Sequence, residues 1–81
     1  MKIGICLPYM KPGMTRADYL TWFQAVDAGP FHSVSCGERV HGPSVDMRIL
    51  LAAAATATTR VEITPTLYVL PMHSAARVAK E

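Results

Sequence analysis

The sequence predicts an α/β protein built on a parallel β-sheet, and three observations carry this prediction. Runs of β-forming residues begin near positions 2, 31 and 61, at a spacing of about 30 residues. A helical pattern of apolar residues follows each run. Of the 81 residues, 51% are hydrophobic and only 17% are charged, a composition typical of a protein core. These features predict a β-α-β-α-β-α order with right-handed crossovers.

The first unit combines a short buried strand with an amphipathic helix. Residues 2–7 (KIGICL) form a continuous apolar run that is too short for a helix and fits a strand buried on both faces. Thr15 fits the N-cap of the next helix, with Asp18 three residues later as a short capping box. The helix is expected to end near Ala28, because Gly29 and Pro30 follow it.

The second unit repeats this arrangement with a longer loop. Residues 31–36 (FHSVSC) predict a strand, and residues 37–44 (GERVHGPS) predict a polar loop. Ser44 is expected to cap a helix over residues 45–58, with Asp46 in its first turn, where a negative charge suits the helix dipole.

The third unit begins with the strand expected over residues 61–69, which are rich in β-branched and aromatic side chains. Pro65 is unusual in its middle, because proline cannot donate to a neighbouring strand and needs an edge, a bulge or a break in pairing. Ser74 fits the cap of a last helix, which is expected to have only begun at Glu81.

The spacing of the units favours the N-terminal part of a (β/α)8 barrel. Eight units of about 30 residues make roughly 240, close to the usual size of such a barrel. Three strands cannot close a barrel, so residues 1–81 are expected to form one partial domain, cut off after the start of the third helix. A doubly wound sheet is the alternative. No GxGxxG motif follows the first strand, which argues against ordinary dinucleotide binding.

Composition and charge argue against several classes of protein. The net charge is +2 and the basic residues are scattered, so no nucleic-acid surface is expected. The two cysteines form neither a disulfide framework nor a metal-ligand pattern. No apolar run approaches the roughly 20 residues of a membrane span, and none matches a signal peptide. We therefore expect a cytoplasmic protein, and the excess of apolar residues indicates either a piece of something larger or a homo-oligomer that hides them. The partner expected besides a second copy is a small-molecule substrate.

Candidate site residues lie in the loops that follow strands, because ligands bind at the C-terminal ends of parallel strands. Glu38, Arg39 and His41 form the densest polar cluster, which could orient a substrate, hold an anionic cofactor or supply a general acid. A solvated loop with a local ion pair is the alternative. His73 could reach into a site or remain an exposed loop histidine. Cys36 ends its strand and could line a pocket.

The third unit also carries a family motif. Its segment VEITPTLYVLPMHSAARVAKE resembles the luciferase-like monooxygenases, which include bacterial luciferase, flavin-dependent alkane monooxygenases and deazaflavin-dependent oxidoreductases. Residues 3–5 (IGI) and 7–8 (LP) resemble the first strand of that family, and Phe31 with Ser33 resembles its second. The positions in register with the motif around the third unit are Ala55, Thr58, Arg60, Val61, Ile63, Val69, Leu70, Pro71, Ala79, Lys80 and Glu81.

This resemblance implies a fold, a cofactor and a set of site residues. The implied fold is the (β/α)8 barrel, with FMN or the deazaflavin coenzyme F420 bound where the strands end and a hydride moving to or from it. A β-bulge with a non-prolyl cis peptide is implied near Thr66 and Leu67, behind the cofactor ring. The implied site residues are Glu38 and Arg39 for catalysis, Thr66, Leu67 and Cys36 for the cofactor, and Tyr9, Met10 and His41 for the substrate. No metal site is expected.

The sequence departs from the family motif at two places. The family's Glu-His after the second strand is Glu38-Arg39 here, and its His-Pro after the third strand is Ser74-Ala75, with His73 one place earlier. Two hypotheses follow. The chain is the N-terminal part of a flavin- or deazaflavin-dependent oxidoreductase or monooxygenase, inactive in isolation. Alternatively, it is a non-catalytic interaction module or inactive fragment that oligomerises to cover its open edge.

Overall fold

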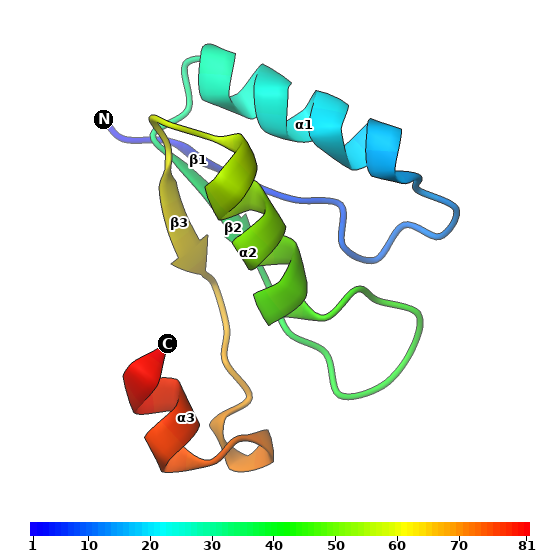
Figure 1. Ribbon diagram of the computed structural model, residues 1–81, viewed down its shortest axis with the longest axis vertical. Coiled ribbons are helices and arrows are strands. Elements are labelled where there is room, and N and C mark those ends of the chain that lie inside the picture. The colour runs from blue at the N-terminus through cyan, green and yellow to red at the C-terminus, as the bar shows by residue number, and fades with distance from the viewer.

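Strands and helices alternate along the whole chain, in the order that the sequence predicts (Figure 1). The computed structural model describes all 81 residues. The elements are β1 (Gly4–Cys6), α1 (Arg16–Ala28), β2 (Ser33–Cys36), α2 (Met47–Ala57), β3 (Glu62–Pro65), a 3-10 turn η1 (Leu70–Met72) and α3 (Ala75–Lys80).

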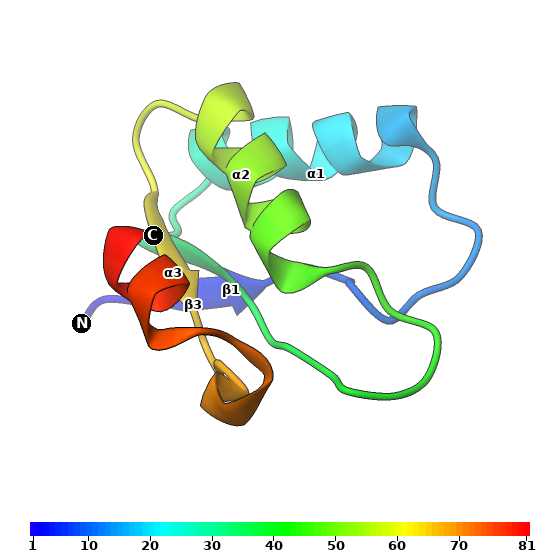
Figure 2. The same ribbon diagram turned by 60° about the horizontal axis from the view of Figure 1, so that its bottom comes forward.

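The three strands form one parallel sheet in the order β1-β2-β3. Its register aligns Ile5 with Val34 and Val34 with Ile63. Both α1 and α2 cover the same face of this sheet (Figure 2). Each crossover therefore moves the chain one strand further in the same direction, and the order of the strands does not reverse. The predicted α/β class with a parallel sheet is confirmed.

The core lies between the sheet and the two covering helices. Phe23 and Val26 from α1 and Leu50 and Ala54 from α2 are buried against Val34 of β2. Only 12 of the 81 residues are buried, so the apolar core is small for the amount of chain that it orders.

The opposite face of the sheet carries small and hydroxyl-bearing residues and is left open by α1 and α2 (Figure 2). Strand alternation places Gly4, Ser33 and Thr64 on this face. A side chain on Gly4 would collide with the hydroxyl of Ser33, which explains why the first strand carries glycine there.

The helix starts show one correct prediction and one error. Thr15 and Asp18 form the predicted capping box: the Thr15 hydroxyl accepts from the Asp18 N–H and the Asp18 carboxylate accepts from the Thr15 N–H. The N-cap of α2 is Asp46, and the prediction of Ser44 is wrong. Asp46 takes that place because its carboxylate accepts from the N–H groups two and three residues later.

β3 is shorter than the strand predicted over residues 61–69, because it ends at Pro65. The backbone N–H of Val69 donates to Glu38 instead of to a strand. The N–H groups of Glu62 and Thr66 donate to β2, so by alternation the imino nitrogen of Pro65 faces the open edge. Proline therefore removes no hydrogen bond from the β2–β3 ladder, which explains its presence in this strand.

The peptide bonds after β3 have the usual trans geometry, as they do throughout the chain. The cis peptide expected near Thr66 and Leu67 is therefore not present. Among the helices, none has both the length and the apolar character needed to cross a membrane.

The edge at which the strands begin is closed by an acidic and a basic side chain. The Asp27 carboxylate accepts from the backbone N–H groups of Thr59, Arg60 and Val61 at 3.0, 2.9 and 3.2 Å. The Arg60 guanidinium donates to the carbonyl oxygens of Asp27 and Gly29 at 2.9 and 2.8 Å. These bonds join the end of α1 to the start of β3, and those to Thr59 and Arg60 contribute most to lowering the pKa of Asp27 to about 2.

Candidate functional site

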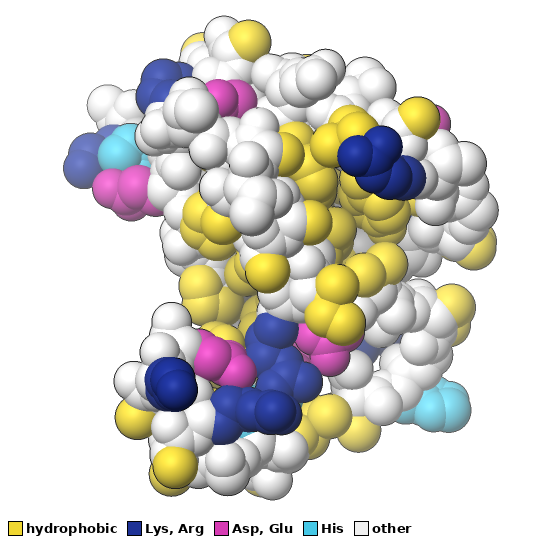
Figure 3. Space-filling model, viewed as in Figure 1, with side chains coloured by type: hydrophobic (Ala, Val, Ile, Leu, Met, Phe, Trp, Pro, Cys, Tyr) yellow, Lys and Arg dark blue, Asp and Glu magenta, His cyan; other side chains and the backbone are white.

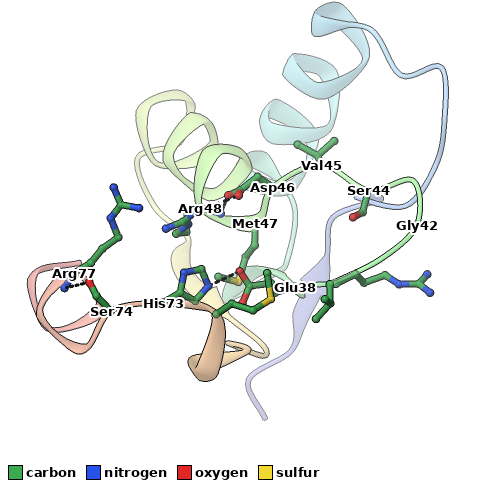
Figure 4. A pocket seen from close by; sticks show the side chains of 13 residues that line it. Glu38, Gly42, Ser44, Val45, Asp46, Met47, Arg48, His73, Ser74 and Arg77 are labelled. Atoms are coloured by element: carbon green, nitrogen blue, oxygen red, sulfur yellow. Dashed lines mark hydrogen bonds and ion pairs between the residues drawn. The ribbon is translucent and has the colours of Figure 1, made fainter.

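The loops that follow β2 and β3 meet at the edge where the strands end. Glu38 lies two residues beyond β2, and His73 lies between η1 and α3. Parallel strands place their C-terminal ends at the same edge, so residues 35 positions apart in sequence come into contact. Figure 4 shows the two side chains pointing toward each other.

Glu38 and His73 form a buried, tightly bonded pair. Nε2 of His73 lies 2.7 Å from Oε1 of Glu38, and each side chain is only 6% exposed. Oε2 of Glu38 accepts from the N–H of Val69 at 2.7 Å. The ring of Tyr68 meets the imidazole edge-on, at a centroid separation of 5.6 Å. The carboxylate therefore has a partner on each oxygen, and the imidazole is held in one orientation.

This arrangement leaves one ring nitrogen of His73 available. An ionised carboxylate only accepts hydrogen bonds, so Nε2 carries the proton that it donates to Glu38. Nδ1 has no hydrogen-bond partner in the protein and can accept a proton. A carboxylate that orients an imidazole in this way makes the imidazole suitable for general acid–base chemistry.

The pair borders a polar cavity of about 540 Å³ between the β2–α2 loop, the start of α2 and α3. Figure 4 shows this cavity, which Arg39 of the β2–α2 loop, Arg48 of α2 and Arg77 of α3 line as cationic residues. The hydroxyl-bearing residues Ser44 and Ser74 also line it. The cavity therefore combines a possible proton acceptor with charged and neutral hydrogen-bond donors.

A second polar network joins α2 to α3 beside the cavity. Arg48 contacts Oδ2 of Asp46 at 3.4 Å and Oε1 of Glu81 at 3.7 Å, and the Tyr68 hydroxyl donates to Oε2 of Glu81 at 2.6 Å. Burial tends to raise the pKa of Asp46, but hydrogen bonds from Arg48 and from the helix N–H groups outweigh it and lower that pKa. The hydrogen bond to Glu81 raises the pKa of Tyr68. Asp46, Glu81 and Tyr68 are thus already partnered.

Of the residues expected to act in catalysis, only Glu38 is built into this pair. Arg39 lines the cavity, but its Nη1 lies 3.0 Å from the sulfur of Met10 and it forms no ion pair with Glu38. The alternative of a local ion pair within this loop is therefore wrong, because Glu38 is bonded to His73. His41 is exposed and forms no hydrogen bond.

Of the residues expected to contact cofactor and substrate, Tyr9, Thr66 and Leu67 lie at the edge where the strands end, whereas Cys36 lies in the core. A Cβ atom built on Gly37 would lie 2.7 Å from the Tyr9 hydroxyl and 3.7 Å from Oγ1 of Thr66, so Tyr9 and Thr66 lie close together over that glycine. Leu67 is 60% exposed beside them. Cys36 is fully buried in the core, facing the helices, so it does not line a pocket as expected. Burial raises the pKa of its thiol to about 11.

Sequence reasoning missed the arginines of the cavity wall. Arg48 and Arg77 lie in helices, whereas the search for site residues considered the loops after strands. Their positions in the first turns of α2 and α3 were the available signal, since the first turn of a helix that follows a parallel strand lies at the same edge as the site. No three His, Cys, Asp or Glu side chains gather as ligands for a metal ion.

The fold and the site thus define an α/β protein with a carboxylate–histidine pair and a polar cavity at the C-terminal edge of its sheet. No family model matches the chain, and neither a curated protein nor a solved structure matches it.

Proposed function

We propose that this chain forms part of a flavin- or deazaflavin-dependent oxidoreductase of the luciferase-like kind, in which a hydride moves to or from the cofactor. The observation that carries the proposal is the Glu38–His73 pair at the C-terminal edge of the sheet. His73 lies within the segment that resembles this family, and Glu38 stands where the family often has an acidic residue. Glu38 matches the acidic position of the motif, whereas His73 lies one place before the histidine of the motif.

The proposed role of the pair is proton transfer. When a C–H hydrogen leaves a carbinol as a hydride with both bonding electrons, the hydroxyl proton must leave as well so that the C=O bond can form. Nδ1 of His73 is the group available to accept that proton. Glu38 is a positioning residue that holds the imidazole and stabilises its protonated form. The reverse reaction uses the same groups with the proton moving back.

The cofactor, FMN or coenzyme F420, would supply the hydride acceptor or donor. Thr66 and Leu67 are exposed at the edge where β3 ends, and Leu67 offers an apolar side chain against which a flat ring could lie. Tyr9 lies next to Thr66 and would border the substrate side. These residues fit a planar ring, whereas the buried Cys36 does not.

In the proposed architecture, the chain supplies three β/α units of a (β/α)8 barrel. Two observations support it: the strand order runs β1-β2-β3 without reversal, and α1 and α2 lie on one face of the sheet (Figure 2). A doubly wound sheet reverses its strand order at the point where ligands bind. Further strands would pair with the open edges of β1 and β3.

The test is a binding and turnover experiment on the natural protein that carries this chain. Fluorescence titration with FMN and with coenzyme F420 should show saturable binding of one of them, and reduction of the bound cofactor by substrate should follow. Absence of binding to both would contradict the proposal. The substrate itself is best sought among alcohols, because a hydride and a proton leave them together.

One observation favours a second candidate, a non-catalytic module that oligomerises. Large apolar side chains remain exposed on the chain, among them Ile3, Leu67, Leu70 and Met72. An open strand edge and such side chains are typical of surfaces that another chain covers. Light scattering over a concentration series would separate the candidates, because a dimer without cofactor affinity supports the module alone.

A further inference from the structure

The carboxylates at the wall of the polar cavity already accept hydrogen bonds, whereas one arginine of the wall has no partner. Both oxygens of Glu38 and both oxygens of Asp46 already accept hydrogen bonds. Glu81, which borders the same region, accepts from Tyr68 and contacts Arg48. The carboxylates near the cavity thus already accept hydrogen bonds, and none of them forms an ion pair with Arg77.

Arg77 is the cation without a partner. Its backbone N–H donates to Ser74, but its guanidinium forms neither a hydrogen bond nor an ion pair. Arg77 of α3 and Arg48 of α2 both line the cavity (Figure 4). Nε of Arg48 is the one buried side-chain nitrogen or oxygen atom of the protein that lacks a hydrogen-bond partner.

Basic side chains lie in the hollow between the upper body and the lower part of the molecule, with acidic side chains on both sides of them (Figure 3). Asp46 and Glu81 form ion pairs with Arg48, whereas no carboxylate pairs with the guanidinium of Arg77, so an anion is attracted to Arg77 first. Guanidinium groups match the geometry of carboxylate and phosphate oxygens and form strong charge-assisted bonds with them. The hydroxyls of Ser44 and Ser74 can add neutral donors.

We propose that this cavity binds the oxyanion group of a ligand, a phosphate or a carboxylate, through Arg77 with support from Arg48. The bound group would lie between α2 and α3, next to the Glu38–His73 pair. If the bound anion is the substrate, the inference rests on the proposed function, because the anionic group would then place the reacting carbon of the substrate near His73. As a statement about binding, it needs only the cavity.

The test is titration of the natural protein that carries this chain with inorganic phosphate, and separately with acetate, followed by ¹H–¹⁵N NMR shifts. Saturable shifts in α3 and at the start of α2 are expected. Arg77→Gln should weaken binding by about tenfold, the effect of removing one charge-assisted contact. Lys80→Gln is the matched control, because it removes the same charge from the same helix outside the cavity. It should change affinity by less than about twofold, since screened long-range charge effects are small.

Two results would overturn the inference: no saturable binding of either anion by the unchanged protein, or an equal loss of affinity in the two variants. Circular dichroism of both variants checks that α3 remains folded. Competition with FMN identifies the source of the oxyanion. Displacement of FMN by phosphate assigns the group to the cofactor, and simultaneous binding assigns it to the substrate. Phosphate binding without binding of either FMN or coenzyme F420 would contradict the proposed function but would still support the anion site.

Discussion

At the edge where the strands begin, Asp27 and Arg60 bind groups of the chain itself, mostly backbone N–H and carbonyl groups. At the edge where the strands end, Glu38 and His73 bind each other beside a cavity. The first pair of side chains uses its hydrogen-bonding capacity to join α1 to β3. The second leaves Nδ1 of His73 free and faces unpaired donors. An acidic and a basic side chain thus stabilise the fold at one edge, and another acidic and basic pair borders the candidate site at the other.

The largest effect is expected for His73 at the site edge. His73→Asn should lower kcat of the proposed hydride transfer by about 100-fold, because general acid–base catalysis contributes at least that much. Added imidazole should restore part of the activity, which a purely structural loss would not allow. His41→Asn is the matched control, since His41 is an exposed histidine in the neighbouring loop. Equal losses in the two variants would contradict the role of His73.

The next largest effect concerns stability at the same edge. Glu38→Ala should lower the free energy of unfolding by about 3 kcal/mol, because it leaves the buried imidazole and the Val69 N–H without their acceptor. Glu38→Gln keeps an acceptor for one of these donors and should cost about 1 kcal/mol. Urea unfolding of both variants measures the difference. An unchanged urea midpoint in Glu38→Ala would show that the Glu38–His73 pair does not stabilise the fold.

The strand-start edge should respond to acid instead. The pKa of Asp27 is about 2 in the folded protein against 3.8 ordinarily, so the folded state favours the ionised form. The resulting stability is present above pH 3.8 and is lost as the pH falls toward 2. Asp27→Asn should be less stable than the unchanged protein at pH 6, and the gap should narrow as the pH falls. A gap that stays constant from pH 6 to pH 2 would refute this link.

The smallest effect is expected at the open side of β3. Pro65→Thr should change stability by less than about 1 kcal/mol, because the nitrogen of Pro65 faces no strand and the substitution mainly adds freedom to the unfolded chain. Thr64→Pro is its counterpart and should destabilise clearly more, since it removes a bond to β2. Thermal unfolding of the two variants compares the sides of the strand. Equal losses of stability in the two variants would contradict the inference that the nitrogen of Pro65 faces the open edge of the sheet.

Features that depend on local sequence could be predicted. The order of elements follows from apolar patterns, and the capping box of Thr15 and Asp18 lies within four consecutive residues. The choice between Ser44 and Asp46 as the cap of α2 could not be made, because both residue types cap helices equally well. The end of β3 was missed because it depends on Glu38, 31 residues earlier, which takes the N–H of Val69.

The candidate site was predictable in place but not in its contacts. The rule that ligands bind where parallel strands end selected the loops of Glu38 and His73. Their mutual bond depends on how far the third loop folds back, which no local pattern reports. The direction of Cys36 depends on which face of β2 the helices cover, and it proved to be the core face. Arg60, a motif position in the sequence, serves the strand-start edge and not the site.

The segment after β3 has no buried residue in η1 or α3. Its attachment to the body runs through Glu38, Arg48 and the short network around Glu81. Amide hydrogens of α3 should therefore exchange with solvent through local opening, while those of β2 exchange only when the whole protein unfolds. A ligand that bridges α2 and α3 would slow the exchange of α3 selectively, so the outer helix would report occupancy of the cavity by its protection alone.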